Sequence, residues 1–192
     1  MQLTSFQKIE LNKRVDKILR APMNVSAGGQ QLEIAFVADI SSGIEAVSDV
    51  IKDAAATLKA HDKIFQNVRS NIVYWNNSSI WSQVAPLSFI QIGKVFENMS
   101  VLSHADVQQG KGIQQLEELC GYLKLYHARC RCIVLFLDFL FEDLKKQYFK
   151  AVNIEQAIEN LNPFLKHRIL IVTRDKMVPG SEMLIHLLQH RK

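Results

Sequence analysis

The stretch "IAFVADISSGIEAVSDVIKDAA", residues 34–55, decides the fold class of this 192-residue chain. It begins with a near-continuous apolar run, which is typical of a strand covered on both faces of a sheet. The run ends at Asp39, and a short segment containing Ser41 and Gly43 follows. Apolar residues then recur at helical spacing, which predicts a helix of about four turns. A buried strand followed directly by such a helix indicates an α/β domain with a parallel sheet.

The same alternation continues along the chain. Apolar runs rich in β-branched residues predict further strands at residues 71–75, 132–138 and 168–173. Helical patterns lie between them at residues 113–126 and 144–161, and a last helix is expected after Pro179 and Gly180. Residues 80–92 contain Pro86, which favours one short edge strand there. The sequence therefore predicts a mostly parallel, Rossmann-like central sheet with helices on both faces and one short antiparallel edge strand.

The first 30 residues are predicted to differ from the rest. Residues 7–20 have a helical pattern, and "SAGGQQ", residues 26–31, is typical of a linker. A chain of this length is enough for one good hydrophobic core. We therefore expect an N-terminal helical extension with a linker over residues 1–30, followed by a single domain over residues 31–192.

Composition and charge exclude several classes of protein. The apolar fraction of 48% and the charged fraction of 22% are those of an ordinary globular protein. The net charge of +4 comes from scattered lysines and arginines, which disfavours a nucleic-acid footprint. No apolar run approaches the roughly 18–20 residues that a membrane span needs, and the N-terminus lacks the apolar core of a signal peptide. Three cysteines do not suit a disulfide framework, so a reducing cytoplasm is expected.

Two aspartates stand where parallel strands are predicted to end. Asp39 and Asp138 each follow an apolar strand directly, and ligands of open parallel sheets bind beyond the carboxyl ends of the strands. Two carboxylates with the Ser41 hydroxyl supply the oxygen ligands that Mg²⁺ and Mn²⁺ prefer. The other interpretation is that Asp39 only caps the following helix, which is the more frequent role for such a residue taken alone.

Three segments together resemble the von Willebrand factor A (vWA) family. "IAFVADISSG" with its long helix resembles the opening of that domain, whose motif is Asp-x-Ser-x-Ser. "QQGKGIQQLEEL", residues 108–119, resembles the family's glycine-rich loop and helix, and "CIVLFLDFLFED", residues 132–143, resembles the strand that carries its second aspartate. The resemblance covers about residues 32–188. It is closest to compact intracellular bacterial members of the type associated with tellurite-resistance clusters.

The resemblance implies a degenerate metal-ion-dependent adhesion site. Asp39 and Ser41 match the first two motif positions, and Asp138 matches the later aspartate. Gly43 stands where the family has a serine, and Lys111 falls at or beside the family's threonine, so two of about five metal ligands are missing. The Lys111 ammonium could instead neutralise both aspartates without metal. The sequence thus predicts either no cofactor or a weakly bound Mg²⁺ or Mn²⁺.

The predicted function is a non-enzymatic, scaffold-like protein-interaction module. It would bind another protein at the carboxyl-end edge of the sheet through Asp39, Ser41, Lys111 and Asp138. The alternative is a metal-dependent phosphotransfer or hydrolytic α/β enzyme that uses Asp39 as nucleophile or ligand. The sequence shows no convincing catalytic set and no phosphate-binding loop pattern. A purely structural subunit with a vestigial site is a third possibility.

The segment "CRC", residues 130–132, lacks the spacing of a redox or metal-binding cysteine pair. We expect Cys132 to lie inside the start of a strand.

Overall fold

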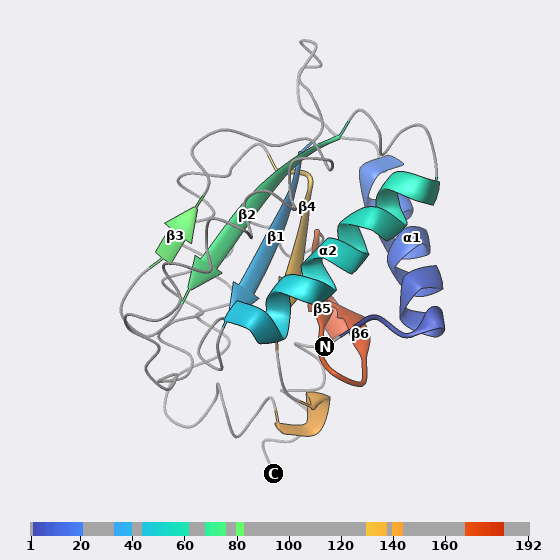
Figure 1. Cartoon of the computed structure of the whole chain (residues 1–192). Helices are drawn as coiled ribbons and strands as arrows, with labels where there is room; N and C mark the ends of the chain where they lie inside the picture. The colour runs from blue at the N-terminus through green and yellow to red at the C-terminus, as the bar shows by residue number, and fades with distance from the viewer. Residues whose placement is uncertain are drawn as a thin grey trace.

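The computed structural model describes residues 2–20, 33–39, 44–61, 68–75, 80–82, 130–137, 140–143 and 168–182. These residues contain a six-stranded sheet with strand order β3-β2-β1-β4-β5-β6 (Figure 1). The strands are β1 (Glu33–Asp39), β2 (Arg69–Trp75), β3 (Ile80–Ser82), β4 (Cys132–Phe136), β5 (Ile169–Val172) and β6 (Met177–Pro179). The helices are α1 (Ser5–Arg20), α2 (Ile44–His61) and the 3₁₀ helix η2 (Phe141–Asp143).

The sheet is mostly parallel, as the sequence predicts. The four central strands β2, β1, β4 and β5 run in the same direction. The short edge strand β3 pairs antiparallel with β2, with Trp75 opposite Ile80. These pairings confirm the α/β fold class and the position of the expected edge strand.

Besides the predicted edge strand β3, the structure has a second antiparallel edge strand, because β6 pairs with β5. The chain reverses after Thr173, whose backbone N–H donates to the Lys176 carbonyl at 2.8 Å. Pro179 then pairs opposite Leu170. Proline is tolerated there because an edge strand leaves one row of backbone groups unpaired. In the sequence the same proline indicated only the break before a helix.

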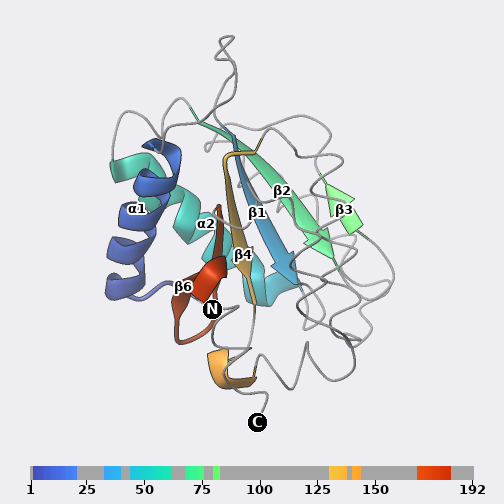
Figure 2. The ribbon, with the colours of Figure 1, turned by 180° about the vertical axis from the view of Figure 1, so that it is seen from behind.

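One face of the sheet packs against α1 and α2. Alternate residues of β1 and β4, including Ile34, Phe36, Val134 and Phe136, share one buried cluster with apolar residues of both helices. Helix α2 crosses in front of the strands in Figure 1 and lies behind them in Figure 2, with α1 beside it in both views. The opposite face is buried as well, as Val37 shows with no exposed surface. The helices predicted at residues 113–126, 144–161 and after residue 182 lie outside the residues described.

Helix α1 is a part of this core. Its buried stripe contains Leu11, Val15 and Leu19, at the i, i+4 spacing of one helical face. Full burial of a leucine or valine side chain contributes about 1.5–3 kcal/mol. The stripe belongs to the same cluster as the strands, so residues 5–20 share one hydrophobic core with the sheet.

Helix α2 packs on the same face of the sheet as α1. Its buried residues are Val50, Ile51, Ala54, Ala55 and Leu58, which match the helical pattern of the sequence. Asp53 on its flank joins the two helices: its carboxylate accepts from the Leu3 backbone N–H at 3.2 Å and pairs with Lys8 at 3.2 Å. Neither of these two described α-helices is long and apolar enough to cross a membrane.

Candidate functional site

The carboxyl ends of β1 and β4 lie side by side. Ala38 pairs with Phe136 in parallel register, and β1 ends one residue later at Asp39. From β1 the chain crosses through α2 to β2 on one side, whereas β4 lies on the other side. Such a reversal of strand order is a topological switch point, where open α/β sheets bind ligands. This edge is therefore the candidate site that the fold itself indicates.

The structure describes only part of the predicted site. Asp39 is the last residue of β1, and its backbone is in register with Trp75 of β2. The Asp39 side chain and the whole of Ser41, Lys111 and Asp138 lie outside the described residues. The adjacency of β1 and β4 is thus observed, and the mutual geometry of the four side chains stays a prediction.

Two buried aromatic residues, Phe36 of β1 and Phe136 of β4, pack against each other close to this edge, and we call them the Phe36–Phe136 floor. The rings of Phe36 and Phe136 are 6.2 Å apart between centroids and tilted by 39°, in the range of favourable aromatic pairs. Both side chains and the neighbouring Ala38 are fully buried. Because close-packed side chains of this kind permit little rearrangement, the two strand ends are held in fixed relative positions.

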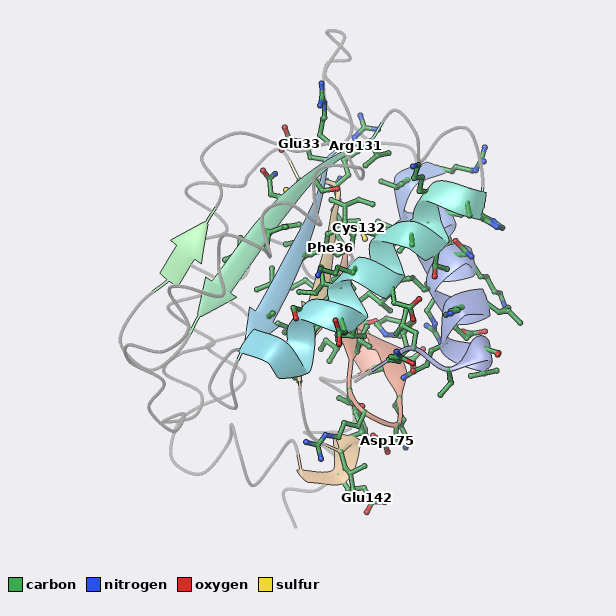
Figure 3. All side chains as sticks on the ribbon, in the orientation of Figure 1. Glu33, Phe36, Arg131, Cys132, Glu142 and Asp175 are labelled. Atoms are coloured by element: carbon green, nitrogen blue, oxygen red, sulfur yellow. The ribbon has the colours of Figure 1, made fainter. Side chains whose placement is uncertain are left out.

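A hydrogen-bonded turn between β5 and β6 forms another part of the same edge. The Thr173 hydroxyl donates to the Asp175 carboxylate at 3.0 Å. The same hydroxyl accepts from the Lys176 backbone N–H at 3.1 Å. Figure 3 shows Asp175 at the end of the sheet where the parallel strands finish. Thr173 is fully buried, so this turn is a fixed element of the edge.

Asp175 also holds the segment that follows β4. Its carboxylate accepts a hydrogen bond of 2.8 Å from the backbone N–H of Phe141, the first residue of η2. The Lys176 ammonium lies 4.9 Å from the centre of the Phe141 ring, within the range of a cation–π contact. On the strand side, the Leu137 N–H donates to the Val172 carbonyl at 2.9 Å. Residues 138 and 139 are therefore bracketed in the sequence by two anchored residues.

The N-terminal helix reaches this edge through Gln7. The Gln7 N–H donates to the Thr4 hydroxyl and the Gln7 amide oxygen accepts from the Thr4 N–H, both at 3.1 Å. This reciprocal pair is a capping box at the start of α1. The Gln7 amide nitrogen additionally donates to the Thr173 carbonyl at 3.3 Å. One buried side chain thus caps the start of α1 and donates a hydrogen bond to the β5–β6 turn.

Sequence reasoning missed Gln7, Thr173 and Asp175. Two local signals were present: "TSFQ", residues 4–7, fits the capping-box pattern, and Thr173 ends a predicted strand just as Asp138 ends another. The signal for Asp175 was weak, because its partner Phe141 lies 34 residues earlier in the chain.

The opposite, amino-end edge of the sheet holds a buried polar cluster. The Asn71 amide donates to the Glu33 carboxylate at 3.0 Å and to the Cys130 sulfur at 3.4 Å. The pKa of the Cys130 thiol is raised to about 12, chiefly by burial. The nearby Glu33 charge also raises it, whereas the Asn71 hydrogen bond acts in the lowering direction. Burial also raises the pKa of Cys132, which begins β4. Figure 3 shows Glu33 at this end of the sheet.

The two described cysteines are structural. Both are buried and free of disulfides, and Cys132 lies inside the strand as the sequence predicts. A thiol with a raised pKa stays protonated near neutral pH, so it is neither a nucleophile nor a good metal ligand. Among the described residues, no group of three or more His, Cys, Asp or Glu side chains is arranged to hold a metal ion.

No protein-family model matches the chain, and no curated protein matches it. The vWA resemblance therefore rests on the residues quoted for it.

Proposed function

We propose that this protein is a non-enzymatic interaction module of vWA type that binds another protein at the carboxyl-end edge of its sheet. The observation that supports the proposal most is the switch point between β1 and β4, where β1 ends on Asp39 beside the strand that precedes Asp138. Asp39 is the last residue of β1, and Asp138 follows the end of β4 in the sequence. The resemblance to vWA domains assigns partner binding to the same edge.

The proposed contact is a carboxylate of the partner, held by a positive charge at this edge. In the metal-free form, the Lys111 ammonium itself offers that charge to the partner's carboxylate. The donor set does not fit a dedicated Mg²⁺ site, because glycine and lysine stand at two of the family's ligand positions. The proposed recognition therefore does not depend on a metal ion.

The surrounding framework suits a preorganised binding site. The Phe36 and Phe136 rings are buried, and the β5–β6 turn is held by hydrogen bonds between its buried Thr173 and its exposed Asp175 and Lys176. A site on such a support loses little conformational entropy when a partner binds, which favours affinity. The described cysteines, which would be the strongest nucleophiles, lie at the other end of the sheet and stay protonated.

The test is capture of partners by the immobilised full chain from a lysate of its source cells. We expect Asp39→Ala to lose the proteins that the unchanged chain captures, while its circular dichroism spectrum is retained. Asp49→Ala is the matched control, because Asp49 is an exposed carboxylate on α2. It should capture the same proteins as the unchanged chain. Equal capture by the Asp39 variant would refute the assignment of this edge.

A further inference from the structure

Helix α1 exposes a second stripe on the side away from its buried one. Phe6 is 71% exposed and Ile9 is 65% exposed. At 100° per residue, three basic residues continue the same line within roughly 80° of the helix circumference. We name this set the α1 stripe, which consists of the exposed residues Phe6, Ile9, Lys13, Lys17 and Arg20. Its first half is apolar and its second half is basic.

The apolar half of the α1 stripe lies outside the buried cluster that the described residues form. Leu11, Val15 and Leu19 on the other face supply the packing that holds α1 against the core. Phe6 and Ile9 are neighbours at i, i+3 and present two large apolar side chains to solvent. Among the described residues only Leu140 is comparably large, apolar and exposed. Two such side chains gathered on one helix are typical of a contact surface.

The basic half of the stripe contains two lysines, Lys13 and Lys17, besides Arg20, which pairs with Asp16. The acidic residues beside it are already engaged, Glu10 with Arg14 and Asp16 with Arg20. None of the ion pairs between described residues includes Lys13 or Lys17. Both lysines are exposed, so the second half of the stripe presents positive charge to a partner.

We propose that the α1 stripe is a docking surface for an acidic amphipathic helix of another protein. Two apolar residues of that helix would pack on Phe6 and Ile9, and carboxylates one or two turns away would face Lys13 and Lys17. Helix-on-surface recognition of this kind uses anchors at i, i+3, i+4 and i+7. The surface is distinct from the carboxyl-end edge, and the inference does not rest on the proposed function there.

Charge and shape disfavour the other occupants. A second copy of α1 would place lysines against lysines in a parallel pair and lysines against apolar residues in an antiparallel one, so neither arrangement is complementary. A membrane-surface helix needs a broad apolar face, whereas the broad apolar face of α1 is already buried in the core. A nucleic-acid contact would leave Phe6 and Ile9 without a counterpart on the phosphate backbone.

The probe is a pair of fluorescein-labelled peptides of about 18 residues with high helix propensity. Each carries two leucines at one end of one face and three glutamates at the other end, in opposite orders, because the direction of docking is open. We expect saturable binding of one peptide order by fluorescence anisotropy with the full chain. Phe6→Ser with Ile9→Ser, and separately Lys13→Glu with Lys17→Glu, should each weaken binding at least about tenfold.

Three controls make the outcome decisive. Lys59→Glu and Leu140→Ser change an exposed lysine and an exposed apolar residue outside the stripe, so they should leave binding unchanged. A peptide with lysines in place of glutamates should bind only the Lys13→Glu, Lys17→Glu variant. Absence of binding up to about 1 mM protein would overturn the proposal. If the chain bound phosphatidylserine vesicles or a short DNA duplex more tightly than it bound either peptide, the proposal would be overturned as well.

Discussion

The Gln7 side-chain amide donates to the backbone carbonyl of Thr173 at 3.3 Å, across 166 residues of sequence. Gln7 belongs to the first turn of α1, and Thr173 follows β5 at the carboxyl-end edge of the sheet. Because Gln7 also forms the capping box with Thr4, one side chain couples the start of the N-terminal helix to the turn beside the candidate site. The first helix is therefore attached to the edge that we propose to bind a partner.

Replacing Gln7 by alanine should lower the free energy of unfolding by about 2 kcal/mol, since it removes a cap and leaves the Thr173 carbonyl without this donor. Urea denaturation measures the change. Gln7→Glu keeps the capping oxygen but not the donor, so it should fall between alanine and the unchanged chain. Gln2→Ala, at an exposed position, is the control and should change stability by less than about 0.5 kcal/mol. An alanine variant as stable as that control would contradict the coupling.

Leu11→Ala should destabilise the protein by about 2–5 kcal/mol, because Leu11 is fully buried in the shared core. Ile9→Ala on the exposed stripe of the same helix is the matched control and should shift stability by less than about 0.5 kcal/mol.

Removal of residues 1–30 should abolish cooperative thermal unfolding, since it uncovers part of the core. A truncated chain that still unfolds cooperatively at an unchanged temperature would show that α1 is dispensable.

Asp175→Ala should release the start of η2 while the sheet persists. The Phe141 N–H loses its 2.8 Å acceptor, so its amide hydrogen should exchange with deuterium at least about tenfold faster. Hydrogen-exchange mass spectrometry of peptides covering residues 137–143 reports this directly. Glu142→Ala changes an exposed neighbour that is not this acceptor, and should leave the exchange of Phe141 as it is. Unaltered exchange in the Asp175 variant would show that another group holds this segment.

Alkaline pH should destabilise the protein through its buried thiols. The folded-state pKa of Cys130 is raised from 9.0 to about 12 by burial, so between these values the unfolded chain releases the thiol proton and the folded chain keeps it. The stabilising contribution is therefore fully present below pH 9 and is lost as the pH rises toward 12. Urea denaturation from pH 8 to 11 measures the slope. Cys130→Ala should make the slope of the free energy of unfolding against pH shallower. An identical slope in this variant would show that groups other than Cys130 cause the loss of stability.

Two assays with the same Asp39→Ala variant test the metal and enzyme hypotheses at the carboxyl-end edge. With two family ligands replaced, we expect the melting temperature to shift by less than about 1 °C in millimolar Mg²⁺ or Mn²⁺, because a native-state ligand stabilises only above its Kd. A clear rise that Asp39→Ala abolishes would establish a functional metal site. Metal-dependent turnover of phosphate monoesters that the same substitution abolishes would establish the phosphotransfer or hydrolytic alternative.

Elements with strong local patterns were predictable from the sequence. The strands β1, β2, β4 and β5 and the helix α2 lie where apolar runs and helical periodicity indicated them, because these signals reflect burial of nearby residues. The helical pattern of residues 7–20 likewise matches α1. Strand β6 was missed, because three residues containing a proline form a strand only when β5 supplies the partner.

For the candidate site, the sequence by itself determined the residue types: an aspartate at the end of β1, another after the apolar run of β4, and glycine and lysine at two of the family's ligand positions. Only the tertiary structure decided that β1 and β4 are neighbours and that α1 belongs to the same core. It also decided that Gln7 meets Thr173 and Asp175 meets Phe141. Local periodicity carries information about burial within one element, whereas pairing between distant segments depends on how those elements pack together.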